Sequence, residues 1–83
     1  MKESDLVFEK VGDINATYPY LCVYDKEDSI NPFMEIAVTD DQQLQYTIYA
    51  GNRNIVLNAW DWECVQRKAQ EFMPRAIANE EGF

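Results

Sequence analysis

The spacing of apolar residues changes along this chain. Through roughly the first two-thirds, apolar and polar side chains alternate with a period of two; in the last third, apolar residues recur every three or four positions. A period of two is typical of a half-buried strand, and a period near 3.6 is typical of an amphipathic helix. We therefore predict an α+β fold, with an antiparallel sheet packed against one C-terminal helix. A chain of 83 residues supports one domain, which we place over 1–83.

Five segments show the strand pattern. In the clearest of them, Met34, Ile36 and Val38 are separated by Glu35 and Ala37, so one face is apolar and the other partly wet. The segments predict strands over about 5–11, 18–25, 33–39, 44–49 and 54–57. Because their connections are short, we expect a meander of four to five successive antiparallel strands.

The helical period begins after Asn58, a good N-cap, and places Asp61 where a carboxylate meets the positive end of the helix dipole. We predict a helix over about 59–73 that ends or kinks at Pro74, with a short helical extension over 74–79. One stripe of this helix is expected to pack on the sheet. Its residues are Trp62, Val65, Ala69, Phe72 and Met73.

The charge balance restricts the function. The sequence has fifteen acidic and seven basic residues, so its net charge is −8. Hydrophobic residues make up 47% of the chain, which is enough for a packed core and argues against intrinsic disorder. Direct nucleic-acid binding is disfavoured because phosphates require lysine and arginine. The chain has no histidine, no glycine-rich phosphate loop and no metal-ligand spacing around Cys22 or Cys64. We therefore predict a protein that is not an enzyme and has no cofactor or metal.

One hypothesis of enzymatic activity remains, in which two carboxylates form a catalytic pair. Glu35, on a predicted strand, could approach Asp61 or Glu63 at the start of the predicted helix. This reading requires a closed pocket in which at least one of the two carboxyl groups has a strongly raised pKa.

Acidic and aromatic residues lie beside one another along the chain, which favours binding of a basic protein. Acidic side chains steer a basic partner into contact, and buried aromatic side chains anchor it. Trp60 lies about 200° around the helix from Trp62, so it either packs against the strand end or is exposed as an anchor. The predicted partner-binding residues are Tyr24, Asp25, Glu27, Asp28, Glu35, Asp40, Asp41, Tyr49 and Trp60.

The sequence shows neither a secretory signal nor an apolar run of membrane-spanning length. We therefore expect a cytoplasmic protein that makes no membrane contact, as a monomer or a weak homodimer.

A small acidic α+β chain with the segment Trp60–Asp61–Trp62–Glu63, acidic hairpin loops and a tyrosine-rich sheet resembles the bacterial immunity proteins that neutralise colicins and contact-dependent growth-inhibition toxins. The resemblance implies a cytosolic inhibitor that binds the toxin's C-terminal domain, often a basic nuclease. Inhibition in that family occurs by occlusion of the active site or an adjacent surface, so no catalytic residues are implied.

Two alternatives remain open. An inhibitor of a DNA-binding machine that mimics nucleic acid would need regularly spaced exposed acids along one face. A small non-catalytic adaptor or oligomer subunit would pair through an apolar sheet edge or helix, and its interface would be insensitive to salt.

Overall fold

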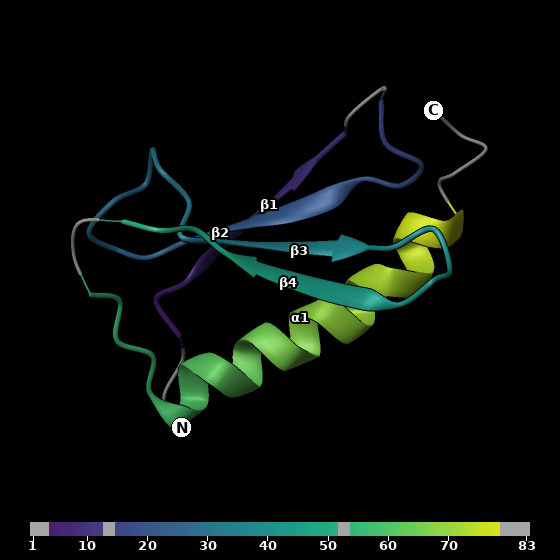
Figure 1. Cartoon of the computed structure of the whole chain (residues 1–83). Coiled ribbons are helices and arrows are strands. Elements are labelled where there is room, and N and C mark those ends of the chain that lie inside the picture. Colours follow the sequence, from purple (N-terminus) through teal and green to yellow (C-terminus); the bar gives the residue numbers. More distant parts are fainter. Residues whose placement is uncertain (1–3, 13–14, 52–53, 79–83) are drawn as a thin grey trace.

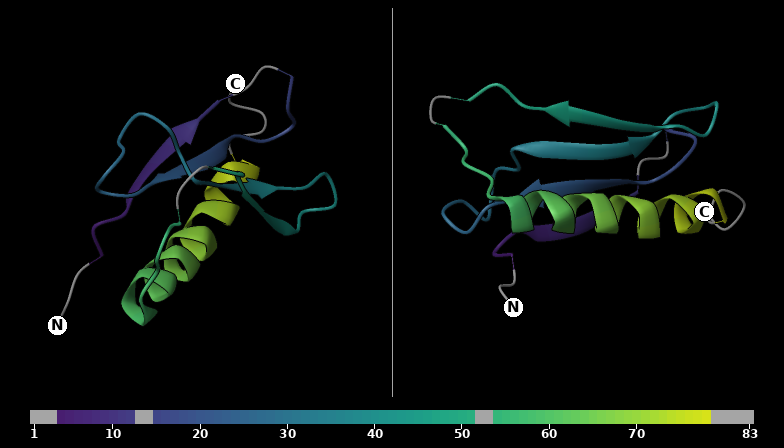
Figure 2. Two further views of the ribbon diagram at one scale, coloured as in Figure 1. Left: turned by 60° about the vertical axis from the view of Figure 1, so that its left-hand side comes forward. Right: turned by 90° about the horizontal axis from the view of Figure 1, so that it is seen from below.

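The computed structural model describes residues 4–12, 15–51 and 54–78. Its elements follow the order β1 (Val7–Val11), β2 (Tyr20–Tyr24), β3 (Met34–Val38), β4 (Leu44–Ile48) and α1 (Ala59–Ala78). The strands form one antiparallel sheet in the order β1-β2-β3-β4, and α1 lies along one face of it (Figures 1 and 2). The predicted α+β meander with a C-terminal helix is therefore confirmed.

The core lies between the sheet and α1. Strand residues that face the helix alternate with residues that face away, as the period of two requires. Ile36 and Val23 are fully buried on the sheet side, and Val65 and Ala69 are fully buried on the helix side. The other buried core side chains are Tyr18, Leu21, Phe33, Met34, Val38, Phe72 and Ala76.

The predicted fifth strand is wrong. Residues 54–57 have the apolar alternation of a strand, and Ile55 and Leu57 do pack against the core. Their backbone nevertheless forms no strand, and the segment leads from the sheet to the start of α1. The alternation in this segment therefore predicted which side chains are partly buried, but it did not predict whether the backbone forms a strand.

The helix does not end at Pro74, and α1 continues to Ala78. A proline inside a helix removes one backbone hydrogen bond to the residue four positions earlier. That residue is Gln70, whose exposed position allows water to bind its carbonyl group. Ala76, beyond the proline, is fully buried and helps to hold the last turn on the sheet. The helical extension predicted over 74–79 is thus present to Ala78, and Asn79 lies outside the described residues.

Trp62 was predicted in the core, but 44% of its surface is exposed. The buried position in the first helical turn belongs to Asp61 instead, at 8% exposure. One residue turns an α-helix by about 100°, so Trp62 lies on the flank of the buried stripe. There its ring lies beside that of Tyr46 on β4, with 6.4 Å between the centroids.

Asp61 caps the helix and connects it to the N-terminal segment. One carboxylate oxygen accepts a hydrogen bond from the backbone N–H of Asn58 at 3.0 Å, and the other accepts one from the Ser4 hydroxyl at 2.7 Å. The Ser4 bond, followed by the Asn58 bond, lowers the pKa of the Asp61 carboxyl below its ordinary value. Asp61 is buried because these donors satisfy its charge.

This geometry predicts an acid-sensitive contribution to stability. Because folding lowers the pKa of Asp61, the contribution is present above its unfolded value and is lost as pH falls through the folded value. We expect Asp61→Asn to lower the free energy of unfolding at neutral pH by about 1–2 kcal/mol, as for a lost helix cap. Urea denaturation at neutral and strongly acidic pH measures this difference, which should shrink in acid. Glu63→Gln, an exposed change in the same turn, is the control; equal effects of the two variants would contradict the assignment.

Candidate functional site

The second face of the sheet is the main candidate surface, because no described helix or strand covers it (Figure 2). We call it the open face. It consists of the strand residues that point away from α1, together with Tyr49, which follows β4. These residues are Val7, Glu9, Val11, Tyr20, Cys22, Tyr24, Glu35, Ala37, Gln45, Thr47 and Tyr49. None of these described residues is a lysine or an arginine.

Strand register places two glutamates on either side of a cysteine on the open face. Glu9 of β1 is opposite Cys22 of β2, and Cys22 is opposite Glu35 of β3. Two strand spacings separate the glutamate backbones, which is roughly 10 Å. Burial raises the pKa of the Cys22 thiol, and the nearby carboxylates of Glu35 and Glu9 raise it further. The thiol therefore stays protonated and inert at neutral pH.

Each glutamate accepts a hydrogen bond from a tyrosine. The Tyr24 hydroxyl donates to Glu9 at 2.9 Å, and the Tyr49 hydroxyl donates to Glu35 at 2.6 Å. The bond to Glu9 raises the pKa of Tyr24 to about 12, and the bond to Glu35 likewise raises the pKa of Tyr49. The face thus presents two fixed tyrosine–carboxylate pairs whose phenols remain protonated at physiological pH.

The Tyr24 pair gives a direct test of this geometry. We expect Glu9→Gln to return the pKa of Tyr24 from about 12 toward the ordinary value near 10. The sign follows because the carboxylate stabilises the protonated phenol, so this contribution to stability is lost only as pH rises through the folded value. Nuclear magnetic resonance of ring-labelled tyrosine at rising pH resolves the shift. Glu71→Gln on α1 should leave Tyr24 unchanged; a Tyr24 pKa unaffected by Glu9→Gln would show that the pair does not form in solution.

A shallow hollow lies at the end of the open face nearest the β3–β4 turn. It encloses about 490 Å³, and Tyr20, Glu35, Ala37 and Gln45 contribute to its lining. Asp40 lies at its rim, where its carboxylate accepts a hydrogen bond from the Thr17 hydroxyl at 2.8 Å. The described lining contains two acids and no base, so the hollow favours a cationic side chain of a partner.

A second acidic groove, of about 340 Å³, lies at the opposite end of the sheet, beside the start of α1. Asp25, Glu27 and Trp60, all predicted partner-binding residues, line this end groove together with Asp5 and Asp61. Trp60 is 37% exposed, so of its two expected positions the structure shows the partly exposed one. Lys26 is the one basic residue in the described lining, and it forms a highly exposed ion pair with Asp5 at 3.7 Å.

Several of the predicted acids also hold turns together. Asp25 accepts hydrogen bonds from the backbone N–H groups of Glu27 and Asp28. Asp28 accepts from those of Ile30 and Asn31. Carboxylates that bond neighbouring amides stabilise the turn, and their remaining lone pairs can still accept from a partner.

Asp41 lies in the β3–β4 turn, where it accepts a hydrogen bond from the Thr39 hydroxyl. Asp40 and Asp41 are therefore at the opposite end of the sheet from Asp25, Glu27 and Asp28. The nine predicted residues form no single cluster. Tyr24, Glu35 and Tyr49 lie on the open face, and the others lie in the loops at its two ends or at the start of α1.

The Glu35–Asp61 form of the carboxylate-pair hypothesis fails on geometry. Glu35 points away from α1, whereas Asp61 lies on the buried stripe of α1, so the two are on opposite sides of the sheet. The pKa of Asp61 is lowered, the reverse of what a general acid needs. Among the described residues, no group of three or more cysteine, aspartate or glutamate side chains is arranged to hold a metal ion.

The predicted set of partner-binding residues omits Glu9 and Tyr20, which belong to the open face. Their alternation with Phe8 and Leu21 was visible in the sequence, but which face is covered depends on where the helix packs. Across the described residues, no helix combines the length and the apolar character needed to cross a bilayer. No family model, curated protein or solved structure matches this chain.

Proposed function

We propose that this protein is an immunity-type inhibitor that binds a basic toxin domain, most simply a nuclease, through the open face. The observation that carries the proposal is the uncovered sheet face with two tyrosine–glutamate pairs and no described lysine or arginine. The overall charge of −8 supports fast electrostatic attraction of such a partner. Inhibition would follow from covering the partner's substrate-binding surface, without chemistry by this chain.

The tyrosine–glutamate pairs suit this role because each pair is already joined by a hydrogen bond. An interface of fixed aromatic side chains loses less conformational entropy on binding than one of flexible side chains. Each carboxylate uses one of its acceptor sites for a tyrosine and retains others for a partner's lysine or arginine. A cation held there also lies beside the tyrosine rings, which adds a cation–π contribution.

The area of the sheet shows that the interface must extend beyond it. Four strands of five residues span roughly 17 Å by 19 Å, or about 320 Å². A stable interface buries about 800 Å² on each partner. The loops at the two ends must therefore take part, which brings in Asp40 and Asp41 at one end and Asp25 and Glu27 at the other. Steered binding of this kind slows as salt rises.

Affinity capture at low and high salt tests the proposal. The baits are the tagged chain, the variant Glu9→Gln/Glu35→Gln, and the control Glu63→Gln/Glu71→Gln, which makes the same charge change on α1. We expect the unchanged chain and the control to retain one basic protein at low salt, and the open-face variant to lose it. The captured protein should be a nuclease that one equivalent of this chain inactivates.

Three results would overturn the proposal. Equal capture by the two double variants would remove the open face from the interface. Retention of only further copies of this chain, undiminished by salt, would favour the oligomer-subunit alternative. A captured nucleic-acid-binding machine without nuclease activity would favour the mimic.

A further inference from the structure

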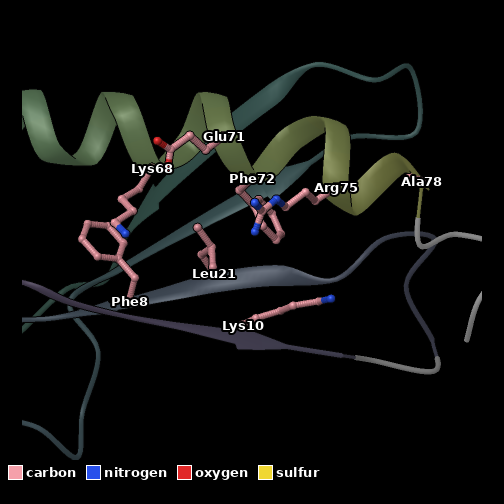
Figure 3. A pocket seen from close by; sticks show the side chains of 8 residues that line it. All are labelled: Phe8, Lys10, Leu21, Lys68, Glu71, Phe72, Arg75 and Ala78. Carbon is pink, nitrogen blue, oxygen red and sulfur yellow. The ribbon is translucent and has the colours of Figure 1, made fainter.

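The helix side of the sheet carries a second surface, which is basic where the open face is acidic. The inference drawn from it does not depend on the proposed function. A groove of about 540 Å³ lies between α1 and β1 (Figure 3). Its apolar lining comes from Phe8 on β1, Leu21 on β2 and Phe72 on α1. Volumes of 300–1,000 Å³ are typical of small-molecule sites.

The groove concentrates the rare basic residues of this chain. Of seven lysines and arginines in the sequence, three line it, from both sides: Lys10 on β1, and Lys68 and Arg75 on α1. Glu71 is the one acid in the described lining, so the local charge is +2 in a molecule of net charge −8. A random distribution of charge would make most surface grooves of this chain acidic, as the hollow on the open face and the end groove beside α1 are.

The two helical cations are placed to hold an anion against the apolar lining. Figure 3 shows Lys68 extending from α1 toward Phe8, and its ammonium group lies 6.0 Å from the centre of that ring. Across the described residues, neither Lys68 nor Arg75 forms an ion pair. Seven residues of helix separate them by about 10.5 Å, with Phe72 between them. A ligand can therefore meet a cation at one end and apolar side chains along its length.

We propose that this groove binds a small amphipathic anion: a phosphate or carboxylate group attached to an apolar body. The anionic group is held by charge-assisted hydrogen bonds from one of the helical cations. The apolar body lies over the partly buried ring of Phe8 and over the small exposed parts of Leu21 and Phe72. At physiological ionic strength the screening length is about 8 Å, so the acids elsewhere on the molecule repel such a ligand only weakly.

Titration with decyl phosphate, followed by amide chemical shifts at physiological ionic strength, tests the inference. Saturable shifts are expected at Phe8, Lys10 and Leu21 and along α1 from Lys68 to Ala78. Decanoate should shift the same amides, and the relative affinities of the two show which anionic group the groove prefers. Decyltrimethylammonium, which has the same alkyl chain and the opposite charge, should not bind there, and inorganic phosphate alone should bind at least about tenfold more weakly because it buries no apolar surface.

Three variants make the test specific. The double variant Lys68→Gln/Arg75→Gln should lower the affinity for decyl phosphate at least about tenfold, as expected for the loss of charge-assisted hydrogen bonds. Arg67→Gln removes one positive charge from the exposed side of α1 and should change affinity less than about twofold. Glu71→Gln removes the acid from the lining and should strengthen binding, so the inference does not rest on a loss alone.

Binding of the cationic amphiphile at the same amides would overturn the inference, as would equal affinity for inorganic phosphate. Shifts spread over the open face, or equal weakening by Arg67→Gln and the double variant, would also contradict it.

Discussion

An Ile36→Ala variant is expected to lose about 2–5 kcal/mol of its free energy of unfolding, the range measured when a large buried aliphatic side chain is removed. Ile36 is fully buried, lies opposite Leu21 and Tyr46 in the register, and faces α1 from the central strand β3. Domains of this size are stable by only about 4–12 kcal/mol. The variant should therefore be partly unfolded under mild conditions.

Urea denaturation followed by circular dichroism measures this loss, with Ile30→Ala as the matched control. Ile30 is 82% exposed in the β2–β3 loop, so its truncation removes the same atoms without creating a cavity. We expect the control to stay within about 0.5 kcal/mol of the unchanged protein. Equal midpoints for the two variants would mean that β3 does not form the centre of the core.

The second large effect concerns binding. Glu35→Lys is expected to weaken the complex with the captured basic protein at least about 100-fold, because it replaces an attraction at the centre of the open face with like-charge repulsion. Glu63→Lys makes the same charge change on the exposed side of α1 and should weaken the complex less than about fivefold, through the loss of steering alone.

Isothermal titration calorimetry on both variants gives the comparison, after circular dichroism has shown that each is folded. The tyrosine partner of Glu35 is Tyr49, which is 39% exposed, so losing their hydrogen bond should affect binding far more than folding. If the two lysine variants bind equally well, the open face is not the contact surface.

Local periodicity predicted most of the fold. The four strands and the helix each lie within about two residues of the expected ranges, except that α1 continues through Pro74 to Ala78. The errors came from properties that periodicity does not encode. Residues 54–57 alternate like a strand but form none, and Asp61 takes a buried position because Ser4, far away in sequence, supplies a hydrogen-bond donor.

The sequence predicted the residue types of the candidate site but not their positions in the fold. Acidic and tyrosine residues were evident from the sequence, but only the topology shows that Asp25 and Asp40 lie at opposite ends of the sheet. The pairing of Tyr24 with Glu9 depends on the register between β1 and β2. The basic groove was missed because Lys10 and Lys68 are brought to the same groove only when α1 packs beside β1.

Hydroxyl-radical labelling of aromatic side chains, with and without the captured partner, shows whether a basic partner covers the open face, because aromatic side chains occur on both sides of the sheet. We expect Tyr20, Tyr24 and Tyr49 to be protected in the complex, while Tyr46 and Trp62, on the helix side, are labelled as in the free chain. Protection of Tyr46 and Trp62, with the three open-face tyrosines unchanged, would rule out the open face as the contact surface.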